Sequence, residues 1–287
     1  MFRCETLVSR PVRGAFKLAA FVLWTLVFYL LLAVAVPLLN LLRLPGTRWA
    51  PSILRTWGRW AAWTMGMRTE VQGQPPRAPF LLVSNHLSYV DVVVLAAQLG
   101  GVFVARGDAA RWPVAGTMCR AADTIFVDRD NRQGVGHALL RMEEMLRQGR
   151  GVVLFPEGTS SAGQTVLPFR PSLLAAAARS GLPVFHASLT YVAAPGGPSP
   201  ATTVCWWGDM TMGRHLVQLF RLPGFSVKVR FGQRALRDND RKILAGKLHE
   251  AVCAQFEPVS AEVSPGVISG RLTAGSPGAM RVGLPGE

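Results

Sequence analysis

The stretch that decides the fold is Pro79–Gln98, PFLLVSNHLSYVDVVVLAAQ, in which an apolar run stops at a polar cluster and a helix-like run begins. Phe80–Val83 predicts a buried strand, because a short apolar run bounded by proline and polar residues is typical of a sheet covered on both faces. Ser88, followed three residues later by Asp91, indicates the capping-box start of a helix. The polar cluster therefore lies at the carboxyl end of a strand, where open α/β sheets bind ligands.

Two residues of this cluster could act together in catalysis. His86 and Asp91 are five residues apart, so on one continuous helix their side chains would point about 140° away from each other. They can meet only if His86 lies in the turn and Asp91 in the first turn of the helix. An aspartate that accepts a hydrogen bond from one imidazole nitrogen leaves the other free to take a proton from a hydroxyl. The same pattern also suits a histidine that ends a strand and an aspartate that caps a helix.

The rest of the chain alternates between strand-like and helix-like segments. Strands are predicted at 101–105, 124–127, 151–155, 183–191, 202–207 and 226–231, and helices at 136–148, 171–179 and 238–256. Strands that alternate with helices predict a mostly parallel α/β sheet flanked by helices.

The N-terminal region indicates contact with a membrane. Residues 18–39 are apolar except for Thr25, which is long enough to cross a bilayer of roughly 30 Å. Residues 47–67 predict a second helix with four tryptophans among arginines, a composition that suits the lipid headgroup layer. Because basic residues lie on both sides of the apolar segment, their distribution does not orient it. We expect a helical hairpin that dips into one leaflet with both ends in the cytoplasm, and a full span is the alternative.

Composition points to three regions and an anionic partner. We expect a membrane anchor at residues 1–72, a catalytic domain at 73–257 and a disordered tail at 258–287, where glycine, proline, serine and alanine dominate. The formal net charge of +14 implies nucleic acid, acidic lipid or a phosphorylated substrate as partner. The four cysteines form no CxxC pair, which favours reduced thiols in the cytoplasm and gives no zinc signature.

Two further predicted strands end in polar turns. The sequence FPEGTS at 155–160 follows one of them, and its Gly158 permits a close backbone approach, so that successive N–H groups could bind an anion or a developing oxyanion. Arg129 follows the strand at 124–127 and suits bidentate contact with phosphate. Each pattern alone also fits an ordinary turn or a solvated surface.

Four blocks of sequence are more specific when they are taken together. They are Asn85-His86-x-Ser88-x-x-Asp91, IFVDR at 125–129, FPEGTS at 155–160 and LPV at 182–184. In order and spacing they closely resemble the motif blocks of the glycerolipid acyltransferase family, whose best-known members are the 1-acyl-sn-glycerol-3-phosphate acyltransferases. The resemblance covers roughly residues 80–231, including WWGDM at 206–210. Members of this family are typically held at the membrane by an N-terminal helical pair.

The resemblance implies a role for each matching residue. His86 would be the general base and Asp91 its orienting partner. The residues predicted to bind substrate are Asn85, Ser88, Arg106, Arg129, Glu157, Gly158, Thr159 and Arg170. Arg129 with residues 157–159 would form the glycerol-phosphate site, and Arg106 stands where many members have lysine. One departure is His186, where the family often has a proline, and it leaves the acyl-donor contacts near it open.

The implied activity is a membrane-bound O-acyltransferase that needs no cofactor or metal. It would move a fatty acyl group from acyl-carrier protein or acyl-CoA to the free hydroxyl of a lysophospholipid, at the cytoplasmic face of a bacterial inner membrane. The resemblance implies 1-acyl-sn-glycerol 3-phosphate, the family's default, as the acceptor, so we expect a 1-acylglycerol-3-phosphate O-acyltransferase that forms phosphatidic acid. A lyso-ornithine lipid or another lysolipid is the alternative, because it would use the same hydroxyl chemistry.

Two other classes of function remain open from the sequence. A membrane-anchored hydrolase could use the same His86–Asp91 pair to activate water on an acyl ester or thioester. A non-enzymatic binder of nucleic acid or acidic lipid would explain the net charge. It would not explain why polar clusters follow three strands, and the basic residues form no dense run.

Overall fold

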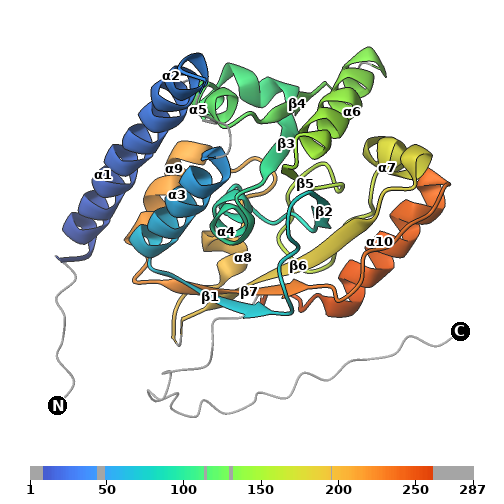
Figure 1. Ribbon diagram of the computed structural model, residues 1–287. Coiled ribbons are helices and arrows are strands. Elements are labelled where there is room, and N and C mark those ends of the chain that lie inside the picture. The colour runs from blue at the N-terminus through green and yellow to red at the C-terminus, as the bar shows by residue number, and fades with distance from the viewer. Residues whose placement is uncertain (1–8, 44–48, 113–114, 129–131, 195, 261–287) are drawn as a thin grey trace, which may run out of the picture.

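The computed structural model describes residues 9–43, 49–112, 115–128, 132–194 and 196–260. Within these residues the strands form a seven-stranded sheet in the order β1-β7-β6-β2-β5-β3-β4, with helices on both faces (Figure 1). The strands are β1 Met67–Gln72, β2 Phe80–Ser84, β3 Val102–Arg106, β4 Ile125–Val127, β5 Gly151–Leu154, β6 Val184–Ala193 and β7 Phe225–Phe231. Neighbouring strands run parallel except β6 and β7, which are antiparallel. The predicted mostly parallel α/β sheet is confirmed.

The helices occupy most of the segments between the strands. They are α1 Ser9–Leu30, α2 Val36–Leu41, α3 Ala50–Met65, α4 Val90–Leu99, α5 Ala115–Ala121, α6 Arg132–Arg147, α7 Ala175–Ser180, α8 Pro200–Thr203, α9 Met212–Arg221 and α10 Arg241–Gln255. A π-helical segment, η1 Leu31–Ala35, joins α1 to α2, and the 3-10 turns η3 Gly107–Arg111 and η4 Pro171–Leu174 follow β3 and precede α7. The helices predicted at 136–148, 171–179 and 238–256 correspond to α6, to η4 with α7, and to α10.

The central strand β2 explains why the sheet is covered on both faces. All five of its residues are buried, and successive side chains point to opposite faces. Leu82 packs in a core with α3, α4 and α9, whereas Leu81 and Val83 pack in a second core with α6, α7 and α10. Figure 1 shows these two groups of helices on opposite sides of the sheet.

The first helices pack closely on the α/β part of the chain. Trp24 of α1 stacks on Trp60 of α3 with ring centroids 5.0 Å apart. In turn α3 lies against α4, and a Cβ added at Gly58 would come within 2.4 Å of the backbone nitrogen of Ala97. Leu54 of α3 belongs to the same hydrophobic core as α4. Part of the region expected to act as an anchor is therefore also a structural layer of the α/β domain.

The strand β1, which the sequence did not predict, continues this layer into the sheet. The predicted helix at 47–67 ends at Met65, because Gly66 takes a left-handed conformation with φ 75° and terminates α3. Met67–Gln72 then pairs with β7 as an edge strand. Its sequence, MRTEVQ, is polar and mostly exposed, so it carries no buried-strand signal.

One predicted strand is wrong, and the helices α5, α8 and α9 were not predicted. The segment 202–207 was expected to be a strand because it is rich in β-branched and aromatic residues. Instead, Ser199 caps a helix by accepting a hydrogen bond from the Ala201 N–H at 3.2 Å, and Pro200 occupies the first helical turn. The chain beyond α8 turns and continues into α9 without forming a strand.

The C-terminal end of the described chain packs against the domain. Val259 is 1% exposed, and its N–H donates to the carbonyl of Gly163 at 2.7 Å. The side chain of Gln164 donates to the carbonyl of Val259 at 3.0 Å. The packed region thus continues to Ser260, and the remainder of the predicted tail lies outside the described residues.

Candidate active site

The turn between β2 and α4 brings His86 and Asp91 together. The Nδ1 atom of His86 lies 2.8 Å from Oδ2 of Asp91, which is the second residue of α4. Asp91 is fully buried, whereas the side chain of His86 is 22% exposed. The imidazole ring stacks on Phe155 with centroids 4.3 Å apart. One ring nitrogen is thus fixed by a carboxylate on a partly accessible histidine.

Asp91 is surrounded by hydrogen-bond donors. Besides His86, its Oδ2 accepts from the backbone N–H groups of Leu87 at 2.6 Å and Ser88 at 3.0 Å. Its Oδ1 accepts from the hydroxyl of Tyr191 at 2.6 Å. Burial and the neighbouring carboxylate raise the pKa of Tyr191 well above its ordinary value, which keeps this hydroxyl a donor. A buried carboxylate needs such donors, because burial without them would disfavour its charge.

The predicted capping box forms only in part. Asp91 accepts from the Ser88 N–H as a capping box requires, but α4 has Tyr89 at its N-cap position with no side-chain cap. The Asp91 N–H instead donates to the backbone carbonyl of Ser88 at 3.0 Å. This leaves the buried Ser88 hydroxyl without a hydrogen-bond partner among the described residues.

Asn85 ties the turn to the neighbouring strand β6. Its Nδ2 donates to the carbonyl of Leu189 at 2.9 Å, and its Oδ1 accepts from the N–H of Leu189 at 2.8 Å. The side chain is fully buried, and these two bonds engage both ends of its amide. This geometry favours a role in holding the catalytic turn over direct contact with substrate.

The FPEGTS turn after β5 lies directly beside His86. Oε1 of Glu157 accepts from the backbone N–H of His86 at 3.2 Å, and the N–H of Ser161 donates to the carbonyl of His86 at 3.1 Å. These contacts follow from the parallel pairing of β2 and β5, which places their carboxyl ends side by side. Gly158 has φ 80°, a left-handed conformation that favours glycine, and the next residue, Thr159, is exposed.

Glu157 is an unusual carboxyl group. It is 3% exposed, and its Oε2 has no hydrogen-bond partner within the described residues. Burial raises its pKa to about 8, and the nearby Asp91 adds to the rise. Hydrogen bonds from the backbone of His86 and Leu167 offset part of it. Glu157 is therefore largely protonated at neutral pH, and a protonated carboxyl can donate a hydrogen bond.

The Trp206 segment connects the two turns. The N–H of Trp206 donates to the carbonyl of Leu87 at 2.9 Å, and its carbonyl accepts from the hydroxyl of Ser160. Its indole ring packs edge-on against Tyr89 and Trp112, with centroids 6.0 Å and 6.2 Å apart. In the sequence this segment was notable only through the family resemblance, since the connection depends on backbone contacts across the fold.

The predicted cationic contacts are less well defined. Arg106 ends β3 and forms a two-point pair with Asp108, with N···O distances of 3.1 Å and 2.9 Å. Arg170 is exposed, and its backbone N–H donates to the carbonyl of Pro156 at 2.9 Å. Arg129 lies outside the described residues. The described part of the chain holds no group of three or more His, Cys, Asp or Glu residues arranged to bind a metal ion.

Comparison with known proteins identifies the family. The family model described as Acyltransferase matches residues 68–189, which include both turns. The lyso-ornithine lipid O-acyltransferase of Rhizobium meliloti (strain 1021) is 35% identical over 205 residues, covering 68% of this chain and 68% of that protein. The chain belongs to the lysolipid acyltransferase family.

Other lysolipid acyltransferases support this assignment. The lyso-ornithine lipid O-acyltransferase of Pseudomonas aeruginosa is 30% identical over 73% of this chain and 81% of that protein. The 1-acyl-sn-glycerol-3-phosphate acyltransferase of Neisseria gonorrhoeae is 27% identical over 69% of this chain and 78% of that protein. The fold also matches the crystal structure of the 1-acyl-sn-glycerophosphate acyltransferase PlsC from Thermotoga maritima, with a TM-score of 0.60, 21% identity, and coverage of 85% of this chain and 96% of that one.

Proposed function

We propose that this lysolipid acyltransferase uses His86 as the general base that activates the free hydroxyl of its acceptor. The observation that carries the proposal is the 2.8 Å contact between His86 Nδ1 and Asp91, made by a partly exposed imidazole at the carboxyl end of a central strand. Since Nδ1–H donates to Asp91, the lone pair on Nε2 is available to accept a proton. A general base of this kind contributes about 10²–10⁴-fold to a rate.

The reaction then proceeds by direct transfer. Nε2 takes the proton of the acceptor hydroxyl while the hydroxyl oxygen attacks the carbonyl carbon of the acyl thioester. The tetrahedral intermediate collapses by breaking the carbon–sulfur bond, and the leaving thiolate receives the proton from the imidazolium. The negative charge of Asp91 stabilises this imidazolium. Protonated Glu157, beside His86, would donate a hydrogen bond to a polar oxygen of the acceptor's head group.

We favour a lyso-ornithine lipid as the acceptor, ahead of 1-acyl-sn-glycerol 3-phosphate. The relatives named as lyso-ornithine lipid acyltransferases are 30–35% identical to the chain. The two Neisseria relatives named as 1-acyl-sn-glycerol-3-phosphate acyltransferases are 27% identical. The ion pair between Arg106 and Asp108 agrees with this preference for a lyso-ornithine lipid. Arg106 was predicted to bind substrate, and Asp108 already partly neutralises its charge before any phosphate binds.

A lipid assay tests both the role of His86 and the identity of the acceptor. The purified full chain would be incubated with acyl-carrier-protein and acyl-CoA thioesters and with lyso-ornithine lipid or 1-acyl-sn-glycerol 3-phosphate, and the products identified by mass spectrometry. We expect diacylated ornithine lipid to form fastest, and His86→Ala to lower the rate at least ~10²-fold. Faster formation of phosphatidic acid would reverse the acceptor order. Release of free fatty acid without an acceptor, at the same rate as with one, would instead identify a hydrolase.

We also propose that the N-terminal hairpin holds the enzyme at the cytoplasmic membrane. The helix Val12–Leu41 contains an 18-residue window of mean hydropathy 2.5, and only 17% of that window is buried. On α3, Trp63 is 71% exposed and lies edge-on to Trp60, which suits an aromatic side chain in the headgroup layer. We prefer a hairpin that enters one leaflet, with the catalytic domain facing the cytoplasm.

Membrane attachment is best tested by substitution, because α3 is part of the domain core. Deleting residues 1–67 would expose the apolar face of α4 and unfold the domain, so loss of activity after deletion would not isolate anchoring. Trp63→Ser should weaken sedimentation with anionic vesicles and leave the melting temperature unchanged. Val217→Ser, at an exposed position of α9, serves as the control and should leave sedimentation with vesicles unchanged. A cysteine placed at Gly73 should react with a membrane-impermeant reagent only from the cytoplasmic side, and reaction from the opposite side would refute the orientation.

A further inference from the structure

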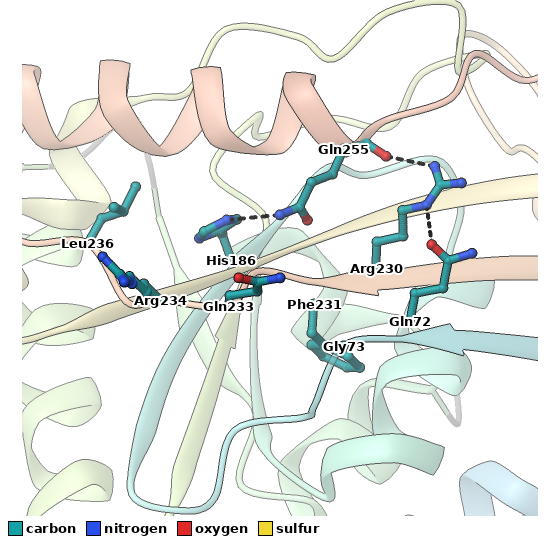
Figure 2. A pocket seen from close by; sticks show the side chains of 9 residues that line it. All are labelled: Gln72, Gly73, His186, Arg230, Phe231, Gln233, Arg234, Leu236 and Gln255. Atoms are coloured by element: carbon teal, nitrogen blue, oxygen red, sulfur yellow. Dashed lines mark hydrogen bonds between the residues drawn. The ribbon is translucent and has the colours of Figure 1, made fainter.

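A groove opens on the face of the sheet opposite α3 and α4. It lies between the C-terminal end of α10 and the strands β1 and β7, and its volume is about 480 Å³ (Figure 2). Leu236 contributes apolar surface, and His186, Arg230, Arg234 and Gln255 contribute polar groups. Phe231 borders the groove, but its side chain packs in the core shared with α4. A volume of this order suits a small molecule.

Two buried polar atoms beside this groove have no partner among the described residues. They are Nδ1 of His186, a residue that is 6% exposed, and Oε1 of Gln255. His186 Nε2 and Gln255 Nε2 lie 3.3 Å apart. Whichever way the Gln255 amide is turned, its single bond to the imidazole leaves one donor and one acceptor unpaired. Unpaired buried groups are costly, so a bound molecule that satisfied both would gain affinity.

The two arginines of the groove differ in their engagement. Arg230 donates through Nε to the side-chain oxygen of Gln72 at 2.9 Å and through Nη1 to the backbone carbonyl of Gln255 at 2.9 Å. It also forms an ion pair with Glu257. Arg234 is exposed and forms no hydrogen bond or ion pair within the described part of the chain. A free guanidinium close to an unpaired imidazole suits an anion with several acceptor oxygens, and phosphate has this chemistry.

The groove is distinct from the catalytic turns. Along β6 the side chains alternate, so His186 faces α10 while Leu189 and Tyr191 face the core shared with α4. The membrane-facing helices α1 and α3 also pack on that other side. A ligand would therefore reach the groove from the aqueous phase.

We propose that this groove is a second ligand site that binds the phosphate group of a small, water-soluble phosphorylated molecule. The phosphate contacts the guanidinium of Arg234 and accepts from the imidazole N–H of His186. A hydroxyl of the same molecule donates to the carbonyl oxygen of the Gln255 side chain. The site does not depend on which lysolipid the enzyme acylates.

Calorimetry on the full chain in detergent tests the site, with ribose 5-phosphate as the probe because it carries both a phosphate and hydroxyls. We expect binding to the wild-type chain, and affinity about 10- to 100-fold weaker in Arg234→Ala, because a charged hydrogen bond is lost. Arg179→Ala, which removes an exposed arginine from α7, is the matched control and should bind like wild type. Neutral ribose should not bind measurably. Equal affinity in wild type and Arg234→Ala, or no binding to the wild type at 10 mM ribose 5-phosphate, would overturn the proposal.

A second variant keeps the test independent of Arg234. His186→Leu removes the unpaired nitrogen while keeping an apolar side chain in a buried position. It also removes the partner of the Gln255 side-chain amide, so the melting temperature of the unliganded variant serves only as the baseline. The variant should abolish the increase of about 5 °C that a hundred-fold excess of ligand over its dissociation constant gives the wild type. A ligand-induced increase that persists in His186→Leu would contradict the site.

Among the water-soluble substrates, the acyl donor could itself supply phosphate to the same groove. Steady-state kinetics with acyl-CoA separates the two sources. We expect Arg234→Ala to leave the KM for acyl-CoA unchanged within about twofold. A rise of tenfold or more would show that the groove belongs to the donor site, and the proposal of a separate ligand site would then be wrong.

Discussion

Asp91 and Glu157 are both buried carboxyl groups at the same edge of the sheet, and their surroundings differ. Asp91 accepts four hydrogen bonds that use both of its oxygens. Glu157 accepts on Oε1 from the backbone of His86, while its Oε2 has no partner among the described residues. The number of donors per oxygen thus separates a carboxylate that can hold its charge from a carboxyl whose pKa rises to about 8.

Under the proposed mechanism, this difference gives the two carboxyl groups separate roles. Asp91 fixes the ring of His86 and supplies a negative charge that the imidazolium needs. Glu157 is neutral before substrate binds, so it can donate a hydrogen bond or give up its proton once a cationic group approaches. The following predictions test this division, from the largest expected effect to the smallest.

Asp91→Asn should have the largest effect. The amide keeps the shape of the carboxylate but removes its charge and turns an NH₂ group toward donors that already point at it. We expect turnover to fall by about 10³–10⁴-fold, the magnitude known for the same change in other histidine–aspartate pairs. Steady-state kinetics with saturating acceptor measures this. Turnover within tenfold of wild type would mean that His86 does not depend on a charged partner.

Asp108→Asn is the matched control for that change. Asp108 carries the same functional group just beyond the end of β3, but it is 52% exposed, and its ion pair among the described residues is with exposed Arg106. An exposed ion pair is worth about 0–1 kcal/mol. Turnover should therefore change less than about fivefold, and a loss as large as that of Asp91→Asn would show that buried and exposed carboxylates at this edge do not differ as proposed.

Tyr191→Phe should have an intermediate effect. It removes one of the four donors to Asp91 without changing the charge or the ring packing. A hydrogen bond to a charged group is worth roughly 1.5–3 kcal/mol, which corresponds to a loss of about 10- to 100-fold if it is fully expressed in the transition state. The pH profile of kcat/KM separates this role from a purely structural one. Asp91 with one donor fewer places more negative charge against the imidazolium of His86 and should move the profile toward higher pH, whereas a purely structural loss lowers the whole profile without moving it. An unchanged rate and profile would show that the three remaining donors suffice.

Among the changes at Asp91, Tyr191 and Glu157, Glu157→Gln should have the smallest effect on turnover near neutral pH, and it should have a clear effect on stability. The glutamine replaces a carboxyl that is already uncharged, so we expect a loss of less than about tenfold at pH 7. The folded pKa of Glu157, about 8, is above its ordinary value of 4.5. Its stabilising contribution is therefore full below pH 4.5 and is lost as the pH rises toward 8, by at most about 5 kcal/mol at 1.36 kcal/mol per pKa unit.

Melting temperatures measured from about pH 5 to pH 8 check this sign. The wild-type protein should lose stability across the range more steeply than Glu157→Gln. Parallel curves for the two proteins would show that Glu157 is ionised in the folded state across this whole range. In that case Glu157 would be charged like Asp91, and the proposed difference between the two carboxyl groups would be wrong.

The turn between β2 and α4 could be predicted from the sequence because its signals are local. The apolar run of β2 ends at Val83, three residues before His86, and the spacing from His86 to Asp91 requires a turn followed by a helix, which is what the structure shows. The contribution of Tyr191 could not be predicted, because it is 100 residues from Asp91 and reaches it only through the pairing of β2 with β6. The partner-free oxygen of Glu157 is also invisible in a sequence, since it depends on which backbone groups of other segments point at it.

The errors at other places have equally local causes. The strand β1 was missed because its residues are polar and exposed at the edge of the sheet, where no buried pattern is required. The segment 202–207 was misassigned because its β-branched residues outweighed the Ser199–Pro200 helix start. Both predictions relied on the secondary-structure propensity of the residues. In the structure, the Ser199 cap forms a helix and the pairing with β7 forms a strand, in each case against that propensity.

The pairing of β1 with β7 has a consequence for how the protein is made. Met67 pairs with Phe225, so the first strand to leave the ribosome must wait for the last one before its hydrogen bonds can form. At about 5–20 residues per second this interval is roughly 8 to 30 s. If α1 and α3 attach to the membrane as proposed, they can do so during that time, while the edge of the sheet is still unpaired. Attachment to the bilayer would then precede completion of the fold, and a nascent chain that stalls before β7 would be a membrane-bound target for chaperones and proteases.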